Sequence, residues 1–134
     1  MQVQPLIAVA DVAKSSWWYQ RLLGVVSAHG GPKYEQLADR EGRMVLQLHA
    51  WDAQEHPNLG KEDEPYGNGV LLWFQVDDFD AVVARARKMS AEILEEPHLN
   101  AGANHREVWL RDRDGYVVVL ASAPGDVAVP PRTK

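Results

Sequence analysis

The segment 70–76 in the second half of the chain is a strand candidate that contains a tryptophan among mostly apolar residues. Because successive side chains of a β-strand point to opposite faces, its even-numbered residues, all apolar, form one face. Leu71, Trp73 and Gln75 form the other face. The even-numbered face is suited to pack on a helix, so Trp73 is left either to line a ligand cavity or to close a hydrophobic core. In a cavity, its indole ring would bind flat or aromatic molecules by stacking and apolar contact.

A second set of polar and aromatic side chains lies in the strand-like segment 107–111. Strand alternation places Glu107, Trp109 and Arg111 on one face. Like Trp73, Trp109 could therefore line a ligand cavity or close a hydrophobic core. His105 lies in the loop before this segment and is a candidate for the rim of a pocket. The polar groups could fix the orientation of a ligand. Alternatively, His105 with Glu107 could act as an acid–base pair.

The segment 44–51 of the first half is another strand candidate, with Val45, Gln47 and His49 on one face. If Gln47 faces a cavity, His49 lies at its edge, either as a hydrogen-bonded structural residue or as a base. The other histidines occur in polar or turn-rich stretches and are expected to be solvated: His29, His56 and His98. No two histidines have the i, i+4 spacing of a metal pair on a helix, and the sequence has no Gly-rich phosphate loop or nucleophile elbow.

The composition limits the classes of partner. The 134 residues include 14 Lys and Arg against 19 Asp and Glu, which gives a net charge of −5. This charge argues against nucleic-acid binding, which needs a basic stripe, and against binding to an anionic membrane. The absence of cysteine rules out disulfides, and a zinc site would need histidine and carboxylate ligands alone. The sequence shows no signal peptide and no membrane-spanning stretch, so the expected location is the cytoplasm.

The expected secondary structure repeats one plan. The first half has a strand at 3–9, a helix at 12–23, and strands at 25–28, 34–38 and 44–51. The second half has a strand at 70–76, a helix at 79–89, and strands at 91–94, 107–111 and 116–121. Asp11 and either Asp77 or Asp78 are the expected helix N-caps. Gly24 is expected to end the first helix with a positive φ.

The repeat is also visible in the residues that form turns. Asp39-Arg40-Glu41-Gly42 in the first half matches Asp112-Arg113-Asp114-Gly115 in the second. One module of this kind cannot cover both faces of its own sheet. We therefore expect an α+β fold in which two βαβββ modules form one curved mixed sheet with a concave, ligand-facing side. The expected organisation is a single domain at 1–124, with module one at 3–51, a linker at 52–69, module two at 70–122 and a flexible tail at 125–134.

Two motifs give the chain a family resemblance. The first-helix pattern Ser15-x-x-Trp18-Tyr19-x-x-x-Leu23-Gly24 and the late turn Arg111-Asp112-Arg113-Asp114-Gly115-Tyr116 resemble signatures of the glyoxalase/bleomycin-resistance (vicinal oxygen chelate) superfamily. In these motifs Trp18 stands where Phe is commoner, and Arg113 replaces a Pro. The resemblance implies the two-module fold. It leaves the function open, because this superfamily includes lyases, isomerases, dioxygenases, antibiotic-modifying enzymes and simple binding proteins.

The resemblance also implies where a metal ion would bind. In the metal enzymes of this superfamily, one residue from each of four strands holds a divalent ion, which polarises a substrate with vicinal oxygens. By resemblance, these positions are Gln4, Gln47, Leu71 and Val119. Leucine and valine have no lone pair to donate, and two neutral amides are poor ligands on their own. We therefore expect no metal and no other cofactor.

Two classes of function remain open. One is a metal-free protein that binds and sequesters a flat or aromatic small molecule, for which the resemblance implies a role in antibiotic resistance. The other is an enzyme, either a metal-dependent lyase or dioxygenase with unexpected ligands or a metal-free acid–base catalyst. The resemblance further implies a homodimer, whose partner could complete the pocket.

Overall fold

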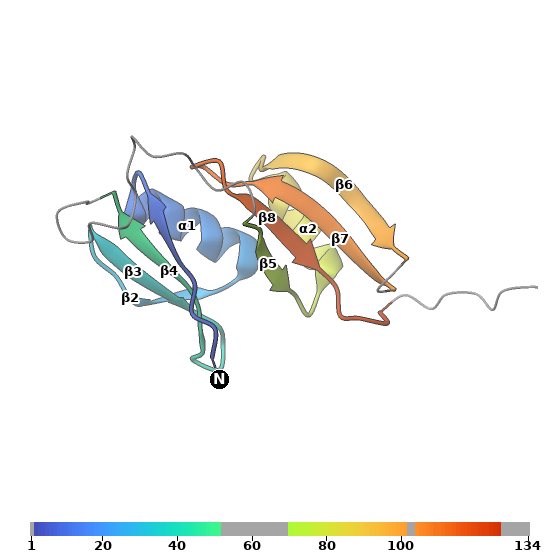
Figure 1. The fold of residues 1–134 in the computed structure, drawn as a ribbon, viewed down its shortest axis with the longest axis horizontal. Helices are drawn as coiled ribbons and strands as arrows, with labels where there is room; N and C mark the ends of the chain where they lie inside the picture. The colour runs from blue at the N-terminus through green and yellow to red at the C-terminus, as the bar shows by residue number, and fades with distance from the viewer. Residues whose placement is uncertain (1, 52–69, 102–103, 127–134) are drawn as a thin grey trace, which may run out of the picture. The chain divides into compact units, whose positions relative to one another are not determined.

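The computed structural model describes residues 2–51, 70–101 and 104–126. These residues belong to two compact units, the first at Met1–Asn68 and the second at Gly69–Lys134 (Figure 1). The expected linker at 52–69, which contains His56, and the end of the expected tail lie outside the described residues. No helix in the described part of the chain is long and apolar enough to cross a membrane.

The first unit is a four-stranded mixed sheet with one helix. Its elements are β1 (Leu6–Val9), α1 (Val12–Leu23), β2 (Val26–His29), β3 (Tyr34–Ala38) and β4 (Met44–Ala50). The strand order is β1-β4-β3-β2, in which β1 runs parallel to β4 and the other neighbours are antiparallel. Helix α1 packs on β3 and β4. The core of this unit is built on fully buried leucines from these elements: Leu22, Leu37, Leu46 and Leu48.

The second unit repeats this topology. Its elements are β5 (Leu72–Gln75), α2 (Phe79–Lys88), β6 (Glu92–Asn100), β7 (His105–Arg111) and β8 (Val117–Ala121). The strand order is β5-β8-β7-β6, again with one parallel pair, β5 with β8, and two antiparallel pairs. Helix α2 packs on β8. Its core residues come from α2, β7 and β8: Phe79, Val82, Ala86, Val108, Leu110, Val118 and Leu120.

The helix boundaries follow the capping residues. The side chain of Asp11 accepts a hydrogen bond of 2.9 Å from a backbone N–H in the first turn of α1. Asp78 does the same for α2 at 3.0 Å, so Asp78 and not Asp77 is the second cap. Helix α1 ends at Gly24, whose φ of 72° lies in the left-handed region that favours glycine. These contacts confirm the expected starts of both helices and the end of the first.

The repeated Asp-Arg-acid-Gly turns have the same hydrogen-bonding pattern. In each turn one carboxylate oxygen of the first Asp accepts two backbone N–H bonds, at 3.0 and 2.9 Å for Asp39 and at 2.9 and 2.9 Å for Asp112. The fourth residue is a glycine with positive φ, 81° at Gly42 and 95° at Gly115, and its N–H donates to the carbonyl of the Asp. The repeat seen in the sequence is therefore a repeat in local structure.

The α+β class and the two βαβββ modules are confirmed, with differences in detail. Hydrogen bonds divide the strands into two four-stranded sheets instead of one continuous ladder, because each described strand pairs only within its own unit. Strand β6 continues past the expected 91–94, because two irregularities in its pairing with β7 accommodate Pro97 at the sheet edge. His105 is the first residue of β7 and not a loop residue, since it pairs in register with Asn100.

Candidate functional site

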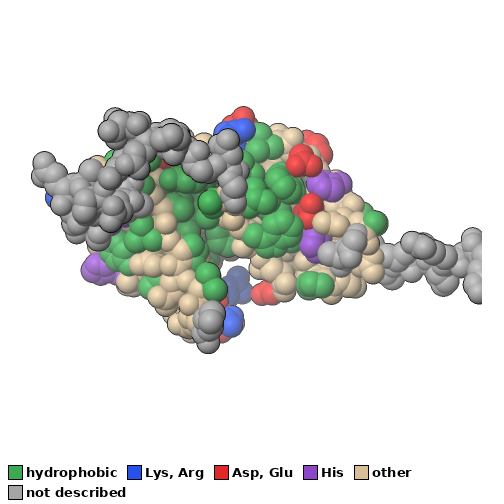
Figure 2. Space-filling view, in the orientation of Figure 1, with side chains coloured by type: hydrophobic (Ala, Val, Ile, Leu, Met, Phe, Trp, Pro, Cys, Tyr) green, Lys and Arg blue, Asp and Glu red, His purple; other side chains and the backbone are tan. Residues whose placement is uncertain are grey.

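In the second unit, α2 covers one face of the sheet, and the other face, which we call the open face because this helix does not cover it, is turned to the viewer in Figure 1. On β5, Leu72 is 6% exposed, whereas the neighbouring Trp73 is 46% exposed. The expected alternation holds within Leu72–Gln75, with Trp73 on the open face, whereas Val70, which was expected on the helix-facing side, precedes the strand and is 61% exposed. Figure 2 shows hydrophobic side chains beside histidine and acidic side chains over this sheet.

Two rows of cross-strand neighbours lie on the open face: Trp73, Val119 and Trp109 form the first, and Gln75, Ala121 and Glu107 form the second. The middle position of each row belongs to β8 and is a small or medium apolar side chain that is fully buried. The outer positions are aromatic or polar. The strand register thus brings four of the predicted ligand-binding residues onto one surface with an apolar floor between them.

Glu107 is only 5% exposed, and four side chains surround its carboxylate. Oε2 accepts hydrogen bonds from His105 Nε2 at 2.8 Å and from Asn100 Nδ2 at 3.3 Å. Oε1 accepts one from Trp109 Nε1 at 3.1 Å and lies 3.3 Å from His98 Nε2. Burial by itself would raise the pKa of Glu107, but these hydrogen bonds, led by that from His105, outweigh burial and lower the pKa. Glu107 is therefore an ionised anchor that orients its neighbours.

His105 is 6% exposed, and its ring is held by Glu107. Because an ionised carboxylate can only accept, Nε2 of His105 carries the proton of this hydrogen bond. The other ring nitrogen, Nδ1, is buried and has no hydrogen-bond partner. The ring of Trp73 lies beside the imidazole, with ring centroids 5.9 Å apart. Since β8 lies between β5 and β7, this indole reaches across β8, where the small side chain of Ala121 leaves room.

Two residues of this site were missed by the sequence analysis, His98 and Asn100 of β6. They pair in register with Glu107 and His105. Nδ1 of His98 lies 2.8 Å from the carbonyl oxygen of Glu96, and because a carbonyl can only accept, Nδ1 is the donor. Nε2 of His98 then faces the carboxylate of Glu107. The backbone hydrogen bond and the nearby carboxylate raise the pKa of His98. His98 was expected to be solvated, and its side chain is indeed 39% exposed. Its contact with Glu107 was not expected; it arises because the strand continues beyond Pro97 and carries this side chain to the site.

Arg111 and Gln75 are two further residues that were predicted to bind a ligand, and they lie at the ends of β7 and β5. The Arg111 guanidinium donates to the carbonyl of Gly115 at 3.2 Å and lies 3.7 Å from the carboxylate of Glu92, so it is held by its own turn and by β6. Gln75 is exposed at the end of β5, two residues from Trp73 and on the same face. Of these two predicted ligand-binding residues, Gln75 is the better placed to meet a molecule on Trp73.

Gln47 and His49 belong to the first unit and form a polar cluster there. The hydroxyl of Tyr34 donates to Gln47 Oε1, and Gln47 Nε2 donates to the carbonyl of Gln4 at 2.9 Å. His49 is 2% exposed, and its Nδ1 bonds the carbonyl of Ala50 at 2.7 Å. These contacts favour the structural role that the sequence left open for His49, and they engage both ends of the Gln47 amide.

The four positions implied for a metal ion do not provide a set of ligands. Gln47 is engaged as described, and Gln4 Nε2 donates to the side chain of Gln2 at 3.3 Å. Leu71 and Val119 carry no donor atom, and Val119 is fully buried. Within residues 2–51, 70–101 and 104–126, no group of three or more His, Asp or Glu residues could share a metal ion. The residues present therefore do not fit a divalent ion at these positions.

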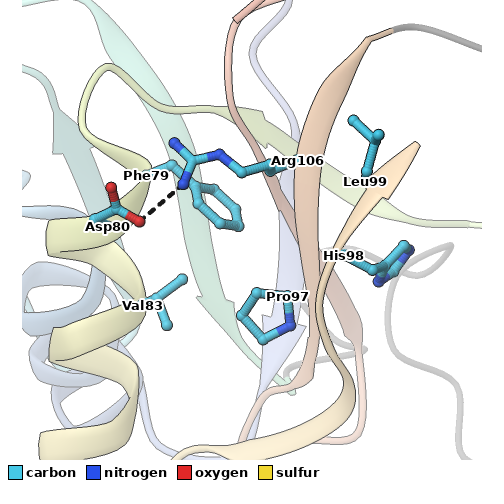
Figure 3. Close-up of a pocket in the computed structure, with 7 residues that line it drawn as sticks. All are labelled: Phe79, Asp80, Val83, Pro97, His98, Leu99 and Arg106. Atoms are coloured by element: carbon cyan, nitrogen blue, oxygen red, sulfur yellow. Dashed lines mark hydrogen bonds and ion pairs between the residues drawn. The ribbon is translucent and has the colours of Figure 1, made fainter. Parts of the chain in front are cut away.

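A separate cavity of about 280 Å³ lies between α2 and β6 in the second unit (Figure 3). Its lining includes Phe79 and Arg106. The guanidinium of Arg106 lies 4.8 Å from the centre of the Phe79 ring and pairs with Asp80 at 2.9 Å and with Asp126 at 3.1 Å. Protein carboxylates thus neutralise the charge at this cavity. Because Arg106 alternates with Glu107 along β7, the cavity lies on the other side of the sheet from the open face.

Known proteins share this fold. An enzyme of the glyoxalase/bleomycin resistance protein/dioxygenase family from Burkholderia phytofirmans PsJN is 22% identical, with a TM-score of 0.73 over 90% of this chain and 96% of that one. TioX from Micromonospora sp. ML1 is 17% identical, with a TM-score of 0.65 over 91% and 98% of the two chains. The fosfomycin resistance protein FosX from Listeria monocytogenes is 13% identical, with a TM-score of 0.66 over 92% and 93%.

Sequence comparison assigns the family. No curated protein sequence matches the chain. A family model, by contrast, matches residues 2–120, which include all elements of both units except the last residue of β8. The repeated turns and the common topology of the two units agree with this match. The chain therefore belongs to the Glyoxalase/Bleomycin resistance protein/Dioxygenase superfamily.

Proposed function

We propose that the open face of the second sheet binds a flat or aromatic small molecule without a metal ion, and that the protein acts by holding this molecule. The observation that carries this proposal is Trp73, which is 46% exposed although it lies on a regular strand. Exposed apolar surface next to polar groups is typical of binding sites. A flat ligand on this indole would gain about 1 kcal/mol from ring stacking beyond the area that it buries.

The surroundings of Trp73 supply the other parts of such a site. Trp109 extends the apolar surface along the same row, and the exposed amide of Gln75 offers a donor and an acceptor. Glu107 holds the rings of Trp109 and His105 through their nitrogen atoms. Side chains that are fixed in advance lose little conformational entropy on binding. The open face is therefore suited to bind a rigid ligand.

The family is consistent with a small-molecule ligand. Its description includes bleomycin resistance, and one protein of the same fold is described as a fosfomycin resistance protein. We include in the proposal a role in resistance by sequestration, a cytoplasmic location and a homodimer, and sedimentation of the purified protein would test the dimer. The aliphatic side chains of Leu71 and Val119 favour binding over metal-assisted catalysis, because they offer no ligand atom.

A second candidate function is metal-free acid–base catalysis. The observation that favours it is the bond of 2.8 Å between Glu107 and Nε2 of His105. A carboxylate that holds one imidazole nitrogen leaves the other in the form that can take a proton. This candidate requires that a bound compound be converted. Turnover by the wild type that is lost in His105→Gln, while binding is kept, would favour the enzyme over the binding protein.

Calorimetric titration with indole, a small flat aromatic probe, tests the proposed function. We expect the wild type to bind indole and Trp73→Ala to bind it at least tenfold more weakly, a loss of about 1.4 kcal/mol. Trp17→Ala is the matched control, because Trp17 is 56% exposed and belongs to the first unit, and its affinity should be unchanged. Equal affinity of Trp73→Ala and the wild type, with circular dichroism showing the same fold, would refute the proposal.

A further inference from the structure

We propose that Nδ1 of His105 accepts a hydrogen bond from the ligand, so that this site selects flat aromatic molecules that carry a hydroxyl or N–H group. The inference rests on the proposed function, because it concerns the same open face. It adds the chemical group by which the protein distinguishes one flat molecule from another.

Glu107 fixes the tautomer of His105. The ionised carboxylate of Glu107 accepts from Nε2 at 2.8 Å, which leaves the proton of a neutral imidazole on Nε2. Nδ1 then presents a lone pair on the other side of the ring. It is the one buried side-chain nitrogen or oxygen in the described part of the chain that has no hydrogen-bond partner. Buried polar atoms are nearly always paired in folded proteins, so an unpaired one indicates a partner that binds there.

The neighbouring polar groups already have partners within the site. Trp109 Nε1 and Asn100 Nδ2 both donate to Glu107, whose carboxylate is surrounded by donors. Apart from the exposed amide of Gln75, Nδ1 of His105 is therefore the group through which a ligand beside Trp73 can be recognised. A lone pair bonds only to a donor. An aromatic hydroxyl or ring N–H can supply one, whereas an ether or a methylated nitrogen cannot.

Trp73 is the aromatic ring beside this imidazole, and we infer that it controls access to Nδ1. Its ring lies 5.9 Å from the imidazole, measured between centroids, although β8 lies between the strands that carry the two residues. Because Trp73 is half exposed, rotation of its side chain is not blocked by a packed core. A ligand that stacks on the indole and displaces it slightly brings its own polar edge to Nδ1. Stacking and hydrogen bonding then act on the same molecule.

A matched pair of probes tests this inference. Indole carries an N–H donor, and 1-methylindole has nearly the same shape without it. We expect the wild type to bind indole roughly fivefold more tightly, the contribution of one neutral hydrogen bond. His105→Lys keeps an N–H donor for Glu107 but has no acceptor atom, so it should bind both probes equally. In ¹⁵N-histidine spectra of the wild type, indole should shift the Nδ1 resonance of His105 and 1-methylindole should not.

The outcomes separate this inference from the proposed function. If both probes bind the wild type equally, leave the Nδ1 resonance unchanged, and bind Trp73→Ala more weakly, the aromatic site stands and the role of His105 is overturned. If neither probe binds, both proposals are overturned. The spectra of the wild type decide the question even if His105→Lys does not fold.

Discussion

Replacing Glu107 by glutamine should destabilise the second unit more than the same replacement of an exposed glutamate in that unit. The carboxylate receives hydrogen bonds from three side chains at 2.8 to 3.3 Å and lies 3.3 Å from a fourth, His98. The single oxygen of the glutamine amide can satisfy about two of these donors. Its NH₂ group would face the remaining N–H donors, and two donors cannot form a hydrogen bond with each other.

The magnitude follows from the hydrogen bonds that are lost. A hydrogen bond to a charged group contributes about 1.5–3 kcal/mol, and Glu107→Gln loses about two of them. Removal of a buried charge recovers part of this loss, since burying the charge itself costs free energy. We therefore expect the free energy of unfolding to fall by about 2–4 kcal/mol. Glu95→Gln, an exposed change on the neighbouring strand β6, is the matched control and should change it by less than about 0.5 kcal/mol.

Urea denaturation at neutral pH, followed by circular dichroism, measures both variants. The pH dependence gives a second readout. The folded pKa of Glu107 is lowered from its ordinary value of 4.5, so its contribution is complete above pH 4.5 and is lost as the pH falls through the folded pKa. Glu107→Gln should lack this acid-sensitive contribution. If its unfolding free energy stayed within about 0.5 kcal/mol of the wild type, the view of Glu107 as the anchor of the site would be wrong.

Three further predictions concern other parts of the structure. The pKa of His98 is raised from 6.5, first by its hydrogen bond to the backbone of Glu96 and then by Glu107, so the protonated ring stabilises the fold below pH 6.5 and this contribution is lost as the pH rises through the folded pKa; His98→Gln should remove this step from urea unfolding measured against pH. Gly42→Ala and Gly115→Ala should each lower the unfolding free energy by about 1 kcal/mol, because both positions have a positive φ that strains the backbone of an alanine, while the added Cβ meets no atom within 4 Å. Thermal scans that show no loss of stability would contradict this. Elemental analysis should find no stoichiometric transition metal, and one Ni, Zn, Fe or Mn per chain that disappears on mutation of Gln4 would show that the ligand positions are misassigned.

Local signals in the sequence were sufficient to predict most of the fold. Helix α1 begins after its Asp11 cap and ends before Gly24, because both signals depend on short-range hydrogen bonds and backbone geometry. The repeated Asp-Gly turns likewise need only neighbouring residues. The length of β6 could not be predicted in this way, because a strand that contains Pro97 is tolerated only at an edge and only with irregular pairing. These are properties of the assembled sheet.

The candidate site was predictable where it depended on alternation along a strand. Trp73 and Glu107 were expected on the ligand-facing side, and the register places them in adjacent rows of one face. Asn100 and His98 were missed because their proximity to Glu107 depends on how β6 pairs with β7 across two irregularities. His49 was expected at a cavity edge, but its burial and its bond to a backbone carbonyl became visible only in the folded unit.

The most direct test of the binding site is a titration of ¹⁵N-labelled protein with indole, observed at the indole N–H resonances of the tryptophans. We expect a saturable shift of the Trp73 resonance, with a smaller shift for Trp109, whose N–H remains bonded to Glu107. Trp17, which belongs to the first unit, should be unaffected. Saturable binding that shifts Trp17 and leaves Trp73 and Trp109 unchanged would contradict the assignment of the site to the open face of the second sheet.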